Sequence, residues 1–284
     1  MIHENKSGIT KIEKKGTKTM KIGIIGAGNM GYPMLCGAVK VAGGENVLFT
    51  CMSDSDKERG KAAGAVYCDS NAELAAQADM IVLVVKPYVY ETVLSEIKGK
   101  VKAGAIVVTV AAGITISYIK ESLGGQIKVV RVMPNTPAMV GEGMSAVTFD
   151  EGSAFTAEEK KVIGAFFDSF GKYVVLPESL QDAAIPASGS SSAFVYVFIE
   201  AMADAAVCCG IPRDTAYKMT AQTVLGAAKM VLETGEHPGK LKDNVCTPGG
   251  TTIAGIRALE ENGFRTAVME ACIATFDKVK SMQK

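Results

Sequence analysis

The segment KIGIIGAGNMGYPM, which begins at Lys21, constrains the fold more than any other part of the chain. Its glycines Gly26, Gly28 and Gly31 follow a short apolar run with the spacing G-x-G-x-x-G. At a strand-to-helix junction the first glycine allows the sharp turn, the second lets a pyrophosphate approach the backbone, and the third lets the helix pack on the strand. The helix N-terminus adds partial positive charge. The pattern predicts a dinucleotide-binding turn.

Short apolar runs rich in valine and isoleucine alternate with stretches of helical spacing from Met20 to about Leu176. Runs without polar alternation are typical of strands that helices cover on both faces. Strand–helix–strand units in series imply right-handed crossovers. The sequence therefore predicts an α/β domain over residues 20–178, with a Rossmann-type, doubly wound, mainly parallel sheet.

The remaining residues, 179–284, are predicted to form an all-helical domain. Phe194, Phe198 and Met202 recur every fourth residue, so one face of their helix must be buried. We expect this small domain to pair its apolar faces with a second copy of the chain. The helices are expected over about Ser188–Cys209, Arg213–Glu233 and Thr251–Asn262, and from Arg265 onward.

Composition argues against several classes of function. Thirty basic and thirty acidic residues cancel, which disfavours a nucleic-acid partner. Two histidines make a histidine-rich metal site improbable, so no metal is expected. Seven cysteines without a C-x-x-C pair are typical of reduced thiols, and the chain is expected to be cytoplasmic.

No membrane span and no secretory signal are expected. The apolar stretch SAFVYVFIEAMADAAVCCG contains Glu200 and Asp204 and is predicted to be a buried helix. Residues 1–19 are polar and basic without an apolar centre, unlike a signal peptide. They are expected to be a disordered leader or a start-site artefact.

The end of the second strand, in CMSDSDKER, bears on the choice of nucleotide. An acidic residue there accepts the ribose hydroxyl of NAD, whereas small polar or basic residues admit the 2′-phosphate of NADP. Ser53 and Ser55 favour the phosphate, Asp54 opposes it, and Lys57 and Arg59 could offset that charge. From these residues NADPH and NADH both remain open.

Three polar loops follow later strands of the predicted sheet, where open α/β sheets bind their ligands. These loops contain Val85, Lys86 and Pro87; Ala111, Ala112 and Gly113; and Asn135. A fourth polar segment, TPGGTTI, indicates a helix start in the helical domain. The N–H groups and hydroxyls of Thr251 and Thr252 could hold a carboxylate there, although an ordinary capped helix after a flexible loop has the same local pattern.

The motifs IGAGNMG, VVKP, MPNTPAMVGEGM, GIPRDTAYKM and HPGKLKDNVCTPGGTTIAGIRALEENGFR together resemble pyrroline-5-carboxylate reductases, in order from Lys21 to the C-terminus. The resemblance implies NAD(P)H-dependent reduction of a cyclic imine to L-proline, with NADP as the favoured cofactor and NADH as the alternative. It also implies a homodimer through the helical domain, and dimers of this family often assemble into decamers. Ser192 and Phe194 depart from the proline and tyrosine of the family pattern.

The motifs and the resemblance together assign candidate site residues. Thr251, Thr252 and Lys86 are the candidate catalytic residues. The substrate carboxylate is assigned to Thr247, Gly249, Gly250, Thr251 and Thr252. The cofactor is assigned to Gly26, Gly28, Asn29, Met30, Gly31, Ser53, Asp54, Ser55, Asn71, Val85, Lys86, Pro87, Ala111, Ala112, Gly113, Asn135, Asn244 and Val245.

A protonated imine is already activated for hydride addition, so such a site needs positioning more than a strong acid. This distinguishes it from a 3-hydroxyacid dehydrogenase, which needs a lysine or comparable acid on the first helix of the second domain, where Ser188–Cys209 has none. A deazaflavin-linked NADP reductase shares the glycine turn but leaves TPGGTTI unexplained. A non-catalytic nucleotide sensor would bind cofactor without turnover.

Overall fold

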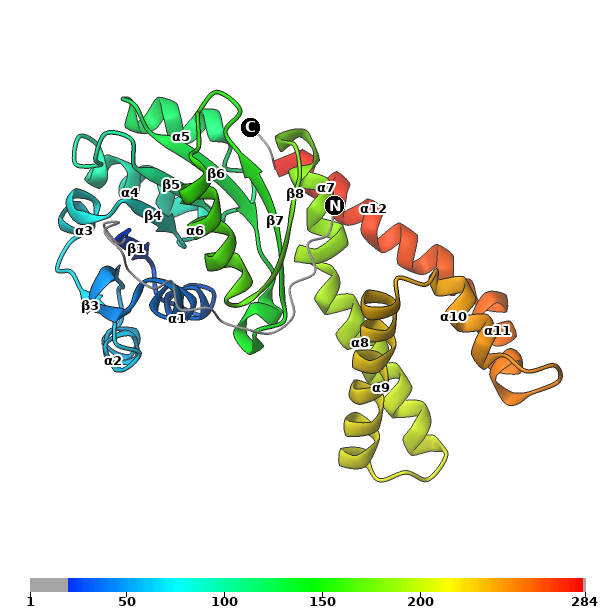
Figure 1. Ribbon diagram of the computed structural model, residues 1–284. Helices are drawn as coiled ribbons and strands as arrows, with labels where there is room; N and C mark the ends of the chain where they lie inside the picture. The colour runs from blue at the N-terminus through cyan, green and yellow to red at the C-terminus, as the bar shows by residue number, and fades with distance from the viewer. Residues whose placement is uncertain (1–19, 283–284) are drawn as a thin grey trace. The chain divides into compact units, whose positions relative to one another are not determined.

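The computed structural model describes residues 20–282, which form an eight-stranded sheet with helices and a separate helical unit (Figure 1). The strand order is β3-β2-β1-β4-β5-β6-β7-β8, and all neighbours are parallel except the antiparallel pair β6 and β7. The strands are β1 (Ile22–Ile25), β2 (Val47–Thr50), β3 (Val66–Tyr67), β4 (Met80–Leu83), β5 (Ile106–Thr109), β6 (Lys128–Met133), β7 (Gly143–Phe149) and β8 (Gly171–Val175).

Two apolar clusters cover the two faces of this sheet, which makes it doubly wound as predicted. One cluster packs strand side chains against α1 (Gly31–Ala42) and α6 (Ala157–Asp168). The other packs them against α3 (Asn71–Gln77), α4 (Tyr90–Ile97) and α5 (Ile116–Leu123). Because side chains alternate between the faces of a strand, the odd and even positions of β1 supply different clusters.

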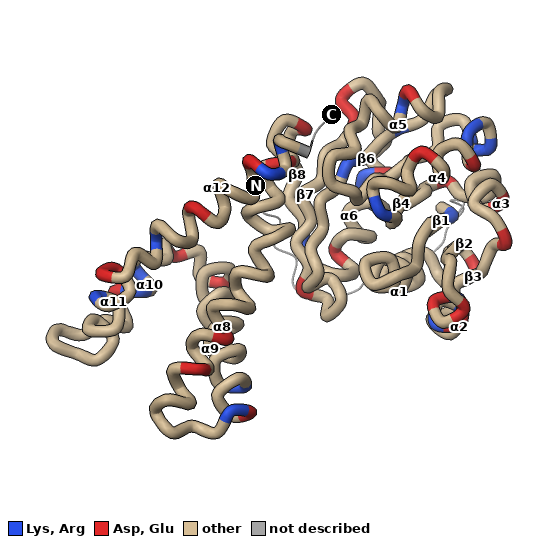
Figure 2. The backbone as a smooth tube through the Cα atoms, turned by 180° about the vertical axis from the view of Figure 1, so that it is seen from behind, with Lys and Arg blue, Asp and Glu red and all other residues tan. Residues whose placement is uncertain are grey.

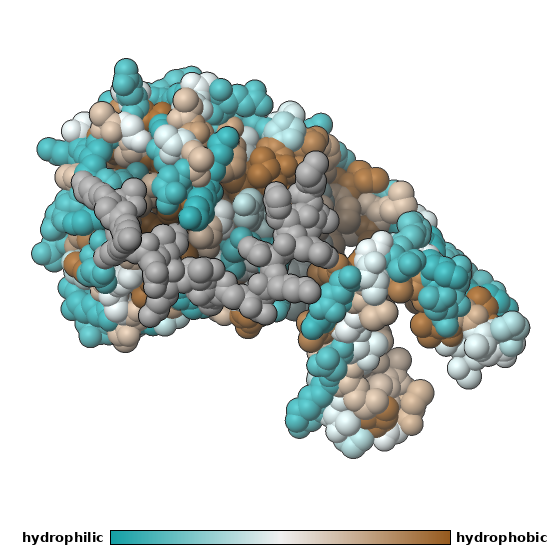
Figure 3. All heavy atoms as spheres, viewed as in Figure 1, coloured by the Kyte–Doolittle hydropathy of each residue, from teal (hydrophilic) through white to brown (hydrophobic). Residues whose placement is uncertain are grey.

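The second compact unit spans Ser190–Thr275 and is helical throughout. Its elements are α8 (Ser191–Cys208), α9 (Arg213–Thr234), α10 (Pro238–Val245), α11 (Thr251–Glu261) and most of α12 (Phe264–Met282). Within it only Ala203, Ala216 and Thr220 are buried. Apolar side chains such as Val197, Leu232, Val268 and Met269 are exposed, and brown apolar spheres show on the surface of these helices (Figure 3).

The sequence predicted the class of both regions and most of the elements. It missed β3, which is only two residues long, and α10, which lies where a flexible loop seemed equally plausible. The helix expected from Ser188 begins instead at Ser191, because residues Ile185–Gly189 form a π-helical turn. The domain boundary expected after residue 178 stays a prediction, and the expected leader lies outside the described residues.

The expectation that the SAFVYVF segment forms a buried helix is wrong for the single chain, since only Ala203 of α8 is buried. By length and hydropathy alone, Glu178–Cys208 could cross a membrane, which is weak evidence for a span because core helices of soluble proteins pass the same test. The absence of a membrane partner therefore stays a prediction. Residues 20–282 contain no cluster of three or more metal-ligating side chains.

Tyr90 joins the carboxyl ends of β4 and β5, the strands that carry two of the predicted site loops. Its hydroxyl lies 2.9 Å from the Leu83 carbonyl oxygen and 2.9 Å from Thr109 Oγ1, and the ring is buried. Burial raises the pKa of Tyr90 to about 12, and hydrogen bonds with Thr109 and the backbone only partly offset that rise. The hydroxyl is therefore a buried polar link that holds both strand ends in place.

Replacing Tyr90 by Phe should lower the free energy of unfolding by about 1–2 kcal/mol, because it leaves buried hydrogen-bonding partners unsatisfied. Urea denaturation would measure the change. Tyr88→Phe is the control, since Tyr88 is 85% exposed and its substitution should leave the unfolding midpoint unchanged. Equal stability of Tyr90→Phe and the original chain would contradict this account.

The same link should give an alkaline pH dependence. An unfolded tyrosine ionises near pH 10, whereas the pKa of folded Tyr90 is raised to about 12. The stability from the neutral hydroxyl is thus fully present below pH 10 and is lost as the pH rises toward 12. The urea midpoint of the original chain should fall more steeply over this range than that of Tyr90→Phe.

Candidate functional site

The glycine turn between β1 and α1 is shaped by close backbone contacts. Gly26 has φ +97°, and a Cβ there would lie 2.4 Å from the Val84 carbonyl oxygen. A Cβ on Gly31 would lie 1.8 Å from the carbonyl oxygen of Gly26. A Cβ on Gly28 would meet no atom within 4 Å, so this glycine faces open space. Two glycines thus shape the turn, and the third leaves room where a pyrophosphate would approach the N-terminus of α1.

The end of β2 leads directly into α2 (Asp54–Ala62), which Ser53 caps. Ser53 Oγ accepts a hydrogen bond from the backbone N–H of Asp56 at 3.2 Å. Ser53, Asp54 and Ser55 are exposed. The structure therefore places the predicted ribose-phosphate residues together at the carboxyl end of the second strand.

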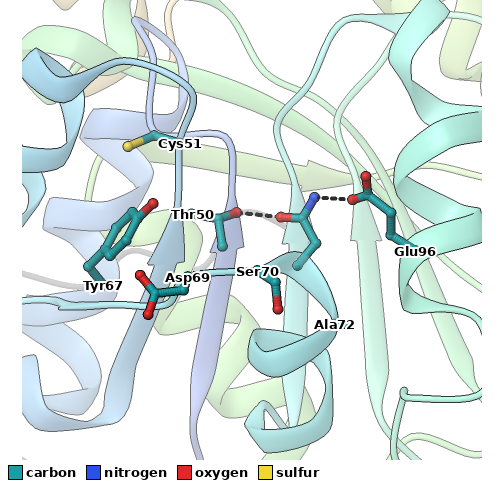
Figure 4. A pocket seen from close by; sticks show the side chains of 8 residues that line it. Thr50, Cys51, Tyr67, Asp69, Ser70, Ala72 and Glu96 are labelled. Carbon is teal, nitrogen blue, oxygen red and sulfur yellow. Dashed lines mark hydrogen bonds between the residues drawn. The ribbon is translucent and has the colours of Figure 1, made fainter.

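A cavity of about 450 Å³ lies beside this position, lined by residues from β2, β3, α3 and α4 (Figure 4). Asn71 is among its lining residues, as the first residue of α3. Asn71 Oδ1 accepts a hydrogen bond from Thr50 Oγ1 at 2.6 Å, and Asn71 Nδ2 donates one to Glu96 Oε2 at 2.6 Å. These contacts fix the amide next to β2. Thr50 and Glu96 were not predicted as site residues, because Thr50 ends β2 and Glu96 lies on α4, and only the packing of these elements around the start of α3 brings them to Asn71.

The other predicted cofactor residues of the sheet domain follow β4, β5 and β6. Lys86 and Pro87 are exposed after β4, and residues 111–113 follow β5. Asn135 is held between two backbone groups: its Oδ1 accepts from Met144 N at 2.8 Å and its Nδ2 donates to Ser188 O at 3.3 Å. Because these strands run parallel to β1 and β2, all the loops lie at one edge of the sheet.

The predicted substrate residues lie in the helical unit, around the start of α11. Gly250 caps this helix without a side-chain hydrogen bond, and its N–H donates to Thr247 O at 3.0 Å. Gly249 has φ +69°, which favours glycine at this turn. Thr251 is exposed and Thr252 half-buried at the first turn of the helix. Asn244 and Val245 end α10 nearby in sequence.

The structure thus gathers the candidate residues into two groups, one at the edge of the sheet and one at the start of α11. It assigns no ligand contact to any of them, so their individual roles stay predictions. The first group has the features that a dinucleotide needs: an open glycine, a helix N-terminus and hydroxyl donors at the end of β2.

Comparisons with known proteins support a single family for both groups. The chain is 45% identical to pyrroline-5-carboxylate reductase of Escherichia coli over 93% of this chain and 98% of that protein. The Arabidopsis thaliana enzyme of the same name is 38% identical over 94% of this chain and 97% of that protein. This chain belongs to the pyrroline-5-carboxylate reductase family.

Other matches agree with this family. The family profile for pyrroline-5-carboxylate reductase dimerisation matches residues 178–282. A profile of F420-dependent NADP oxidoreductases matches residues 21–113, which include the glycine turn but not the helical unit. The solved reductase of Coxiella burnetii has a TM-score of 0.87 at 30% identity and covers 94% of this chain and 100% of its own. That of Plasmodium falciparum, solved with NADP bound, has a TM-score of 0.80 at 32% identity and covers 95% of this chain and 100% of its own.

Alanine substitutions at Gly28 and at Gly31 should distinguish a glycine that leaves space for the ligand from one that the fold requires. Gly28→Ala places a methyl group in open space, so the reductase should keep its melting temperature but lose dinucleotide affinity. Gly31→Ala drives a methyl group into the Gly26 carbonyl, so it should lower the free energy of unfolding by about 1–3 kcal/mol. Thermal unfolding and calorimetric titration with NADPH would measure both effects. Unchanged affinity in a folded Gly28→Ala chain would contradict the assignment of the turn.

Proposed function

We propose that this chain is a 1-pyrroline-5-carboxylate reductase, which transfers hydride from NADPH to the cyclic imine and produces L-proline. The decisive observation is the match to the Escherichia coli enzyme over nearly the whole length of both proteins, which spans the glycine turn and the TPGGTT segment together. The F420-dependent profile accounts only for the first of these regions. The proposed cofactor is NADPH because the Plasmodium relative was solved with NADP.

The reaction requires little acid–base chemistry from the protein. When bound, the nicotinamide cofactor supplies the hydride. The imine is protonated or readily protonated, so the protein's task is to orient the ring and exclude water. The exposed N–H groups at the start of α11, with Thr251 and Thr252, are proposed to hold the substrate carboxylate. Lys86 is proposed to lie near the reacting half of the cofactor.

The active form is proposed to be at least a homodimer through the helical unit. Few residues of that unit are buried in the single chain, and the family profile that matches it describes dimerisation. Assembly into a decamer is a further proposal that rests on the family resemblance. We also propose a cytoplasmic location, which agrees with seven cysteines that include no C-x-x-C pair.

The direct test is steady-state oxidation of NADPH and of NADH by the purified protein with the cyclic imine, with proline quantified as product. We expect turnover when NADPH and the imine are both present, and no turnover without the imine. Binding of NADPH without proline formation would contradict the enzyme assignment and favour a nucleotide sensor.

Replacing Thr252 by Ala should weaken the substrate grip without disturbing the cofactor. Loss of a hydrogen bond to a charged group costs about 1.5–3 kcal/mol, so KM for the imine should rise about tenfold or more. The dissociation constant of NADPH, measured by fluorescence titration, should change less than about twofold. Thr223→Ala is the control, because Thr223 Oγ1 donates to Met219 O of its own helix and Thr223 is not a candidate site residue. A large loss of NADPH affinity with an unchanged KM would contradict the carboxylate assignment.

A further inference from the structure

Asp56, on the first turn of α2, binds the residues that would favour a phosphorylated ribose. Ser53 Oγ donates a hydrogen bond to Asp56 Oδ2 at 2.8 Å, and Arg59 Nη2 donates one to Asp56 Oδ1 at 2.8 Å. The two oxygens of one carboxylate therefore engage a hydroxyl and a guanidinium at once. Figure 2 shows charges of both signs on α2.

Arg59 also contacts the glycine turn directly. Its Nη2 donates to the carbonyl oxygen of Ala27, the residue between Gly26 and Gly28, at 3.1 Å. Its guanidinium carbon lies 4.1 Å from the centre of the Tyr32 ring on α1. Arg59 Nε is buried without a hydrogen-bond partner among the described residues. A cation of α2 is thus connected to the glycine turn.

The placement of these side chains is fixed by the packing of α2 on the sheet. Gly60 lies against Phe49 of β2 so closely that a Cβ would approach the ring to 2.4 Å. The neighbouring residue Arg59 is therefore held near the glycine turn by contacts of the helix backbone. Its side chain is 38% exposed and that of Asp56 27% exposed, so added ligand could reach both groups.

We propose that Asp56 determines the discrimination between 2′-phosphorylated and 2′-hydroxyl dinucleotides. Its carboxylate binds Ser53 and Arg59 and so competes with the 2′-phosphate for them. The inference rests on the proposed function, because it takes the end of β2 as the ribose site. The Ser53 proton and the Arg59 N–H that bind Asp56 are unavailable to a phosphate in this arrangement. The carboxylate itself also repels a phosphate dianion.

Other charged residues of the same segment are placed differently. Asp54 is exposed as the first residue of α2. Lys57 Nζ lies 4.0 Å from the centre of the Tyr67 ring. Lys61 pairs with Glu58 at 3.4 Å. Asp56 is therefore the carboxylate whose removal would release both Ser53 and Arg59, and this distinguishes it from Asp54.

The experiment compares the binding of two cofactor fragments without the nicotinamide half, 2′,5′-ADP and AMP, by isothermal titration calorimetry. Asp56→Asn keeps the shape of the side chain and removes its charge. The ratio of the two dissociation constants should shift toward 2′,5′-ADP by roughly tenfold, the scale of one partly screened charge–charge interaction. Arg59→Met, which keeps the length of the side chain, should shift the ratio toward AMP.

Glu58→Gln is the matched control, because it removes one negative charge from the same helix at a side chain that pairs with Lys61. Its ratio should stay within about twofold of the original chain. Circular dichroism would confirm that each variant is folded. If Asp56→Asn shifts the ratio of the two dissociation constants toward 2′,5′-ADP no further than Glu58→Gln does, the inference is overturned and the enzyme assignment stays intact. A folded original chain that binds neither fragment would instead overturn the proposed dinucleotide site.

Discussion

The close contact of β1 and α1 at the glycine turn is the constraint on which the sheet domain and its proposed site both depend. The carbonyl oxygen of Gly26 occupies the space of a Gly31 side chain, and the carbonyl oxygen of Val84, directly after β4, occupies that of a Gly26 side chain. The backbone N–H of Gly26 donates to Thr50 O, which ties the turn to the end of β2. These contacts hold the strand ends that lead into the polar loops at one edge of the sheet, without any ligand.

The helical unit is stabilised by a different means. Its amphipathic helices bury few residues within the unit, although α8 and α9 pack against each other over much of their length. A small helical unit with so little core gains most of its stability from apolar surface that another protein surface covers. The match of residues 178–282 to a dimerisation profile supports the proposal that a second copy of the chain covers this surface. In the proposed dimer, assembly would be part of folding for this region.

The sequence predicted what depends on local pattern and missed what depends on contacts between distant segments. Glycine spacing and apolar runs were sufficient for β1, α1 and the sheet class, because a strand or helix carries its own periodicity. The two-residue strand β3 has no period to detect, and α10 begins at Pro238 in a polar segment with only a histidine cap. The link from Thr50 through Asn71 to Glu96 joins three elements, and no spacing in the chain encodes it.

The charged residues after β2 are another case in which the sequence could not predict the contacts, and here the contacts bear on function. In the sequence, Asp54 and Asp56 are equivalent carboxylates near two serines and two cations. The structure separates them, because Ser53 caps α2 and the third residue of that helix, Asp56, then points back to the cap. One helical turn further, Arg59 reaches the same carboxylate and the glycine turn together. Helix geometry thus decides which carboxylate is coupled to the proposed ribose site, and cofactor preference becomes a property of the α2 N-terminus rather than of net charge.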